Sequence, residues 1–290
     1  MSFFDLVITV FLPLSLAVIM FSLGVGLVVG DFVRVVVRPL SFLTGAFNQL
    51  LLVPFVTFLI IVTFGIEGEL AVGMMILSAC PGGVTSNVLS KWAQGDVALS
   101  VTLTAVISFV SIISVPLIVS FAMGYFMSDS GVEVSITDII LRLFLLSAVP
   151  VALGMTLRHF FPKVMIGLEP LLNKIAVVLF LLIFILACAA GWNVLMANAF
   201  TLGPALLTLI TVLLLAGYFL SVALGRSTAE AKTISIETGL QNTPMGVTIG
   251  TIVATDALVT GYTLPAGVYG VVMFIPALAA IYLFRKSSSS

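Results

Sequence analysis

The sequence predicts an all-α polytopic membrane protein with nine transmembrane helices, and three observations lead to this fold class. Hydrophobic residues make up 61% of the 290 residues and charged residues only 8%, against about 25% charged residues in a typical soluble domain. Apolar runs long enough to cross a bilayer recur along the chain, and the basic residues fall in every second connection between them. We therefore expect a single transmembrane domain over residues 1–290.

The spans can be placed by the charged residues that separate them, because a helix needs about 20 residues to cross a hydrocarbon core of about 30 Å. The predicted spans are 6–29, 39–64, 70–90, 97–127, 136–157, 168–191, 202–224, 233–255 and 258–284. The start, Met1-Ser-Phe-Phe-Asp5, lacks a basic n-region. We therefore expect the first run to be a retained helix and not a cleaved signal, with the mature chain beginning near Met1.

The distribution of charge predicts the orientation, because cytoplasmic connections collect Lys and Arg. Ten of the eleven cations follow odd-numbered spans: Arg34, Arg38, Lys91, Arg158, Lys163, Lys174, Arg226, Lys232, Arg285 and Lys286. The other side holds Glu67, Glu69, Asp129, Glu133, Asp138 and Asp256, with Arg142 as its one basic residue. We expect a multi-pass protein of the plasma membrane, or of the inner membrane in a Gram-negative bacterium, with the N-terminus outside and the C-terminus in the cytoplasm.

Two of the predicted spans carry helix-breaking residues at their middles. The third contains Cys80-Pro-Gly-Gly-Val-Thr-Ser-Asn87, and the eighth contains Glu237-Thr-Gly-Leu-Gln-Asn-Thr-Pro244. Proline removes a backbone donor and glycine frees φ, so both helices are expected to break there. Unpaired backbone at membrane depth is tolerated only where protein or a water-filled cavity covers it.

The two broken spans are predicted to enter the membrane from opposite sides. This arrangement is typical of an inverted-repeat transporter fold with two discontinuous crossing helices, in which ions and substrate bind where the broken helices meet. The predicted repeats are approximately 6–127 and 168–284, with 136–157 as a linker helix. Panel and core bundles of helices are expected to interleave along the chain.

Glu237 is the one carboxylate set well inside an apolar stretch. A charge at the bilayer centre costs about 2.5 to 3.5 kcal/mol on an insertion scale, so such a residue normally has a cation or a proton to hold. Hard cations such as sodium prefer oxygen ligands. Candidate oxygens near the breaks are those of Gln49, Ser86, Asn87, Ser100, Thr104 and Gln241. Ser100 and Thr104 are four residues apart and share a helix face, as do Glu237 and Gln241.

The segments Ala79-Cys-Pro-Gly-Gly-Val-Thr-Ser-Asn-Val88, Gly95-Asp-Val-Ala-Leu-Ser100 and Glu237-Thr-Gly-Leu-Gln-Asn242 resemble the bile acid:sodium symporter family, over nearly the whole chain. The resemblance implies two co-transported sodium ions. One site would use Ser86, Asn87, Ser100, Thr104 and Glu237. The other would use Gln49, Glu237 and Gln241 with the carbonyls of Thr238 and Leu240.

The resemblance also implies a small organic anion as substrate, with Asn242 at a position that contacts the anion. Helical N-termini attract anions, and new ones are expected near Val84 to Ser86 and near Thr243 to Met245. Val84, Thr85 and Thr243 are therefore further substrate-binding candidates. By this resemblance we expect the nine-helix form of the family, without the first helix of its ten-helix bacterial members. The almost purely apolar segment 264–274, where some relatives carry His or Asn, leaves bile salts, pantoate-like acids and pyruvate-like acids open.

Other functions are weighed against sodium symport. A proton-coupled organic anion transporter could titrate Glu237, and a non-transporting sensor could bind an anion at the crossing. Ser100 and Thr104 could bond their own helix carbonyls, and Gln49 could serve helix packing. The sequence contains no nucleophile, metal or nucleotide motif, so we expect no enzyme; we expect no nucleic-acid binding either, and a monomer. Cys80 and Cys188 are expected to be packing residues, and Gly24 and Gly26 a close-packing surface.

Overall fold

The computed structural model describes residues 10–127, 136–190, 192–254 and 260–286. Its helices are α2 (Leu12–Gly26), α3 (Val29–Val37), α4 (Pro39–Phe47), α5 (Val53–Phe64), α6 (Gly68–Ala79), α7 (Val84–Trp92), α8 (Val97–Phe126), α9 (Ile136–Leu143), α10 (Val149–Phe160), α11 (Pro162–Ala190), α12 (Trp192–Ala223), α13 (Thr228–Gly239), α14 (Thr243–Val253), α15 (Leu264–Val272) and α16 (Phe274–Lys286), with the π-helical turns η2 (Asn48–Leu52) and η3 (Phe144–Ala148). The predicted outer acidic residues Asp129, Glu133 and Asp256, and the predicted start at Met1, lie outside the described residues.

The described residues contain six helices long and apolar enough to cross a membrane: Pro39–Phe64, Val97–Phe126, Ile136–Phe160, Pro162–Ile183, Met196–Ala223 and Leu264–Lys286. The bent pair Gly68–Ala79 and Val84–Trp92 makes a seventh. The multi-pass, all-helical prediction is therefore confirmed, whereas the count of nine spans is not. Leu12–Gly26 is short for a span, and α13 and α14, with 12 and 11 residues, are each shorter still.

The polar helix α13 is nevertheless enclosed by protein. Every residue from Glu230 to Gly239 is buried, and α12, α8, α7 and α4 pack around it. Its start also corrects the predicted boundary at residue 233. Ser227 and Glu230 form a capping box, a sequence signal that begins the helix at Thr228. Lys232, predicted to lie in a connection, is consequently inside the helix and 1% exposed, where its Nζ donates to the carbonyl of Phe284 at 2.8 Å.

The π-helical turns η2 and η3 each end two residues before a proline, Pro54 and Pro150 respectively. A proline ring clashes with the carbonyl four residues earlier in a regular α-helix, and an extra residue in the turn relieves that clash. The helix Pro39–Phe64 therefore continues through Pro54 without a break. The turn in η2 carries Gln49, so it sets the direction in which this predicted ligand projects.

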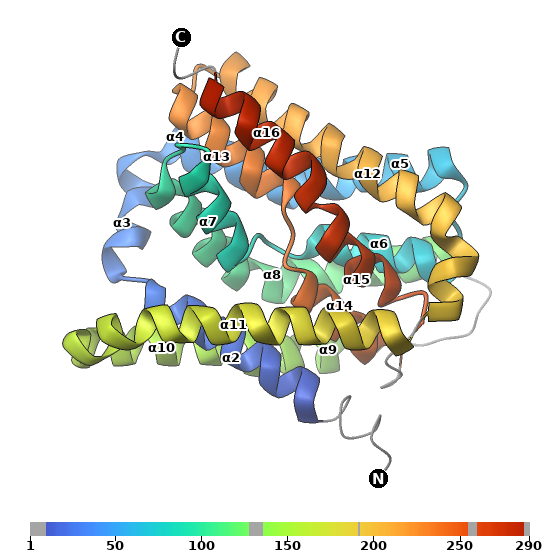
Figure 1. Cartoon of the computed structure of the whole chain (residues 1–290), viewed down its shortest axis with the longest axis horizontal. Helices are drawn as coiled ribbons and strands as arrows, with labels where there is room; N and C mark the ends of the chain where they lie inside the picture. The colour runs from blue at the N-terminus through green and yellow to red at the C-terminus, as the bar shows by residue number, and fades with distance from the viewer. Residues whose placement is uncertain (1–9, 128–135, 191, 255–259, 287–290) are drawn as a thin grey trace.

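The helices form two groups (Figure 1). In the first, α2 packs against α10 and α11. Gly24 and Gly154 allow the backbones of α2 and α10 to touch: a Cβ at Gly154 would lie 2.5 Å from the Phe21 carbonyl oxygen. Ser22 Oγ adds a hydrogen bond of 2.9 Å to Asn173 Oδ1 of α11. The predicted close-packing role of Gly24 is thus confirmed.

The second group surrounds the two broken helices (Figure 1). Across the break the axis of α6 and α7 bends by 63°. Helix α7 packs against α13, and α6 packs against α14. The first broken helix runs from α6 to α7. The second runs from α13, beside α7, to α14, beside α6, so the two broken helices run in opposite directions through their crossing.

Candidate sodium and anion site

Both predicted breaks are present, at Cys80–Gly83 between α6 and α7 and at Leu240–Asn242 between α13 and α14. The backbone N–H of Asn242 donates to the Pro81 carbonyl at 2.7 Å. The α6 break is capped by the Cys80 N–H on Leu77 O at 3.1 Å, and the α13 break by the Leu240 N–H on Ile236 O at 2.9 Å. The hydrogen bond between the breaks satisfies backbone groups that would otherwise be costly at this depth.

Glu237 lies beside the crossing on α13 and is 5% exposed. Thr104 Oγ1 of α8 donates to Glu237 Oε2 at 3.0 Å, and Ser100 Oγ donates to Oε1. Ser100 Oγ also lies 2.8 Å from Asn87 Oδ1 of α7. These hydroxyls therefore bond to neighbouring helices. The alternative that Ser100 and Thr104 only bond to carbonyls of their own helix is excluded.

Ser86 completes the set of residues predicted for the first ion. Its Oγ donates to Gly83 O at 2.8 Å, and it borders Gly82 together with Glu237. We call Ser86, Asn87, Ser100, Thr104 and Glu237 the Glu237 cluster. Four of its members are almost fully buried, with Asn87 partly exposed. The cluster presents carboxylate, amide and hydroxyl oxygens from three helices, which is the ligand chemistry of a hard cation.

The residues predicted for the second ion also lie together, across the two breaks. Gln49 Nε2 donates to Gln241 Oε1 and to Cys80 O, both at 2.8 Å, and Gln241 Nε2 donates to Thr238 O at 3.0 Å. Leu240 is buried in the break itself. We call Gln49, Thr238, Leu240 and Gln241 the Gln49 cluster. Its hydrogen bonds also serve helix packing, so the packing alternative for Gln49 is compatible with this geometry.

A cavity of about 10 Å³ lies between the two clusters, lined by Gly45, Gln49, Gly82, Leu103, Thr104, Ile107 and Glu237. A cavity of this size has room for roughly one water molecule. Its polar lining comes from the predicted ligands of both sites. The space beside Glu237 therefore matches a small ion or a single water in size.

Gly82 is a site residue that sequence reasoning assigned only to the helix break. A Cβ at this position would collide with Glu237 Oε2 and lie 2.8 Å from Ser86 Oγ. Ser90 was not predicted at all; its Oγ lies 3.2 Å from Ser100 Oγ. It sits four residues after Ser86 on α7, a spacing that would have placed it on the same helix face.

The four predicted substrate residues line one cavity of about 380 Å³. Val84 and Thr85 open α7 there, and Asn242 and Thr243 open α14. The remaining wall is largely apolar and comes from α2, α11 and α16, including Phe180, Leu181, Phe274 and Leu278. The cavity therefore pairs two helix N-termini, which favour anions, with a hydrophobic wall.

The two polar atoms of the Asn242 side chain have different surroundings at this cavity. Its Oδ1 accepts from the Met245 N–H at 3.1 Å and caps α14. Its Nδ2 is buried and has no hydrogen-bond partner among the described residues. An unpaired buried donor costs about 1 to 3 kcal/mol, so this amide is a ready donor for an acceptor in the cavity.

Comparisons with known proteins identify the family. The model of the Sodium Bile acid symporter family matches residues 13–198. An ileal sodium/bile acid cotransporter of Oryctolagus cuniculus is 30% identical over 284 residues, covering 96% of this chain and 79% of the relative. A sodium-dependent organic anion transporter of Bos taurus is 27% identical, covering 97% of this chain and 75% of the relative.

A plant relative is named as a cotransporter of sodium and a metabolite. The probable sodium/metabolite cotransporter BASS1, chloroplastic, of Arabidopsis thaliana is 30% identical over 244 residues, covering 82% of this chain and 58% of the relative. The alignments with the rabbit and bovine proteins include α13 and α14, since they cover almost the whole chain. The chain therefore belongs to the sodium bile acid symporter family, whose members are transporters and not enzymes.

Proposed function

We propose that the protein is a secondary active symporter that moves an organic anion together with two sodium ions by alternating access. The observation that carries the proposal is the position of Glu237, which is buried where two oppositely directed broken helices meet and is surrounded by hydroxyl and amide oxygens. The names of the relatives support sodium coupling and an organic anion as cargo.

The first ion would bind in the Glu237 cluster and the second in the Gln49 cluster. A sodium ion close to Glu237 would offset the cost of keeping that carboxylate ionised in a low-dielectric interior. The hydroxyls of Ser100 and Thr104 would then turn their lone pairs toward the ion. Glu237 contributes to both predicted sites, so binding of one ion would fix the position of a ligand of the other site.

The anion would bind in the 380 Å³ cavity beside the breaks. Its carboxylate would meet Asn242 Nδ2 and the N-terminal amides of α7 and α14, and its apolar part would meet Phe180, Leu181 and Phe274. The residues of the breaks, such as Leu240 and Asn242, stand between the ions and the cavity. Sodium binding would thereby set the geometry of the anion site, which is a basis for coupling.

Alternating access would consist of a movement of the α2–α10–α11 group, the proposed panel, against the broken helices and their neighbours, the proposed core. The 380 Å³ cavity is lined from both groups. A second cavity, of about 190 Å³, lies between α2, α7, α8 and α11 and is lined by Asn87, Lys91 and Glu169 among others. It borders the Glu237 cluster at Asn87 and is a candidate route for the release of an ion.

The test is a series of melting temperatures of the purified protein in sodium, with potassium at the same ionic strength as control. A ligand that binds only the folded state adds about 2.7 kcal/mol of stability at 100 times its dissociation constant. We expect a sodium-specific rise that Glu237→Gln removes, followed by sodium-dependent uptake of an organic anion into vesicles. Equal melting in the two salts, with uptake that follows pH instead, would favour proton coupling. Binding of an anion without uptake would favour a sensor.

A further inference from the structure

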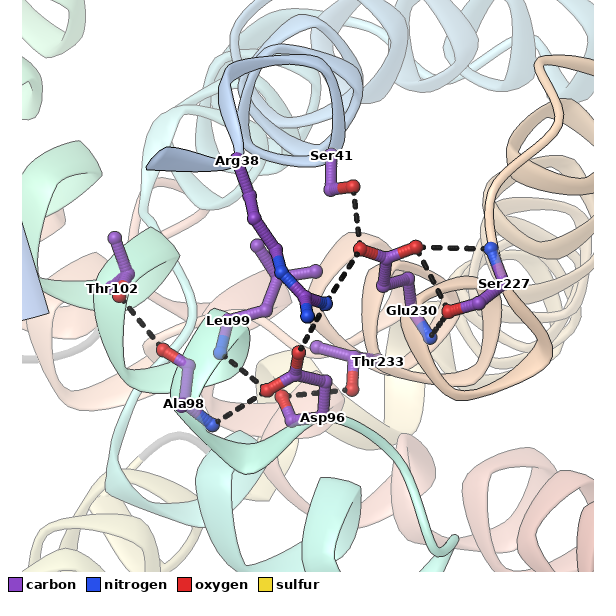
Figure 2. Close-up of polar contacts among 9 residues, drawn as sticks. All are labelled: Arg38, Ser41, Asp96, Ala98, Leu99, Thr102, Ser227, Glu230 and Thr233. Carbon is purple, nitrogen blue, oxygen red and sulfur yellow. Dashed lines mark hydrogen bonds and ion pairs between the residues drawn. The ribbon is translucent and has the colours of Figure 1, made fainter. Parts of the chain in front are cut away.

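A cluster of charged residues lies outside the site, at the ends of the helices that carry the predicted sodium ligands. Arg38 Nη1 lies 3.4 Å from Glu230 Oε1 and 3.8 Å from Asp96 Oδ2. Figure 2 shows the guanidinium between the two carboxylates. Arg38 directly precedes α4, Asp96 directly precedes α8, and Glu230 lies in the first turn of α13. One cation therefore joins the starts of three helices.

Each carboxylate is also fixed to its own helix. Asp96 Oδ1 accepts from the Ala98 and Leu99 N–H groups at 3.1 Å and caps α8. Glu230 Oε2 accepts from Ser227 in the capping box of α13, while its Oε1 takes a hydrogen bond of 2.7 Å from Ser41 of α4. Any displacement of these carboxylates is therefore a displacement of a helix start.

Backbone contacts seat the α7–α8 connection against α13 at the same place. Thr233 Oγ1 donates to Asp96 O at 3.1 Å, and the Asp96 N–H donates to Ala229 O at 3.3 Å. Gly95 permits this approach, because a Cβ there would lie 3.2 Å from Ser90 O and would collide with Thr233 Oγ1. The ion pairs and these contacts form one joint, which we call the Arg38 joint.

The spacing along each helix connects the joint to the sodium ligands. Ser100 follows Asp96 by four residues and Glu237 follows Glu230 by seven. At 3.6 residues per turn these are about one and two turns, so each of these ligands stands on the same face of its helix as a member of the joint. Gln49 lies further along the helical run that Arg38 precedes, in the turn η2. The space between is filled by the packed residues Phe42, Leu99, Leu103 and Ile234. A close-packed interior transmits displacement.

We propose that Arg38 is a positioning residue for sodium binding, which neutralises Asp96 and Glu230 together and so holds α4, α8 and α13 at the spacing that brings Gln49, Ser100 and Glu237 together. The inference rests on the proposed sodium sites. Without Arg38, Asp96 and Glu230 would lose the cation that lies between them, and the repulsion between their like charges would act on α8 and α13 at their starts.

The experiment measures the sodium concentration at half-maximal thermal stabilisation, together with sodium-dependent uptake, for wild type and Arg38→Gln. We expect this midpoint to rise about 2- to 5-fold in the variant, because the Arg38 side chain is 65% exposed and an exposed ion pair contributes up to about 1 kcal/mol. Stabilisation at saturating sodium and the dependence of uptake on anion concentration at saturating sodium should be unchanged. Arg38→Lys, which keeps the charge without the planar fork, should fall between the two.

A second substitution separates charge neutralisation from simple loss of packing. Glu230→Gln in the Arg38→Gln background removes one of the opposed charges and keeps the capping box, which accepts Gln at this position. We expect it to return the sodium midpoint most of the way to wild type. Arg158→Gln is the matched control: it breaks the 2.8 Å ion pair with Glu169, which joins α10 to α11, and should leave the sodium midpoint unchanged.

The outcomes distinguish the proposals. A wild-type sodium midpoint in Arg38→Gln and Arg38→Lys, with only a lower melting temperature, would overturn the positioning role. Failure of Glu230→Gln to restore the midpoint would overturn the neutralisation mechanism. If wild type itself is not stabilised by sodium, the proposed sodium symport fails before any variant is compared.

Discussion

The backbone amide of Asn242 donates to the carbonyl of Pro81 at 2.7 Å, and this one hydrogen bond joins the two helix breaks. Each break leaves backbone groups without a partner inside its own helix. Where the breaks pair, Gly82 lies against Glu237. Asn242 lies in the lining of the 380 Å³ cavity. The position of the crossing therefore depends on how closely the two chains can approach, which leads to the first prediction.

Gly82→Ala should abolish sodium-specific stabilisation, because its methyl group would occupy the space of Glu237 Oε2 and Ser86 Oγ. The neighbouring Gly83→Ala is the matched control, since a Cβ there has no contact closer than 3.8 Å, to Asn242. The measurement is melting temperature in sodium and in potassium for both variants. An unchanged sodium response in Gly82→Ala would contradict the proposed place of the ion.

Thr104→Val should raise the sodium concentration for half-maximal stabilisation about tenfold or more, since a hydrogen-bonding group beside a charge contributes about 1.5 to 3 kcal/mol. Ser111→Ala, on the same helix, should leave it unchanged, because Ser111 Oγ donates to its own helix at Ser108 O, 2.7 Å away. Sodium titrations of both variants check this prediction. Equal shifts would indicate a general effect of losing a hydroxyl from α8.

Asn242→Asp should lose anion uptake and keep sodium-specific stabilisation. Aspartate preserves the oxygen that caps α14 at Met245, but it replaces the donor Nδ2 by an acceptor and adds a charge that repels an anion. Uptake of a radiolabelled anion tests the first part of this prediction, and melting temperatures over a sodium series test the second, on one preparation. Retained uptake would exclude Asn242 as an anion contact.

The stability of the protein should depend on Glu230 in a defined pH range, because this carboxylate lies in the first turn of α13, outside the six apolar spans, and is paired there with Arg38. Burial raises the pKa of Glu230, but hydrogen bonds from Ser41 and Ser227 and the charge of Arg38 lower it by more, so the net pKa lies below its usual value. A depressed pKa contributes stability that is fully present above the ordinary glutamate pKa, about 4.3, and is lost as the pH falls through the folded-state value.

The difference in melting temperature between wild type and Glu230→Gln should therefore be largest near neutral pH and should shrink as the pH falls below about 4. The two proteins are compared at each pH in the same salt, so titration of other groups affects both. A difference that stays constant with pH would mean that the carboxylate charge of Glu230 does not stabilise the fold.

The parts of the site that local sequence determines could be predicted. Pro81 with Gly82, and Gly239 with Pro244, set both breaks and the starts of α7 and α14, because proline and glycine act on the chain at their own position. Glu237 was identifiable because a carboxylate in an apolar stretch is costly without a partner.

The parts that depend on distant neighbours could not be predicted. Arg38 and Glu230 are 192 residues apart in sequence, and nothing local to either indicates their contact. The close approach of Gly82 to Glu237 and the π-helical turn that carries Gln49 likewise follow from tertiary packing. The count of nine spans is not confirmed, because α13 and α14 are only 12 and 11 residues long, and because α13 is polar yet surrounded by helices, so its hydropathy does not reveal that it is buried.

The contact between α2 and α10 at Gly24 and Gly154 has a mechanical consequence. Helices whose backbones touch cannot slide past one another without steric collision, and the hydrogen bond from Ser22 to Asn173 ties the same unit to α11. Its face toward the crossing is built from Ile19, Val177, Phe180 and Leu181, which meet their neighbours through non-directional contacts. This unit, the proposed panel, is therefore stiff inside, and the slide along its apolar face that we propose would break few directional contacts.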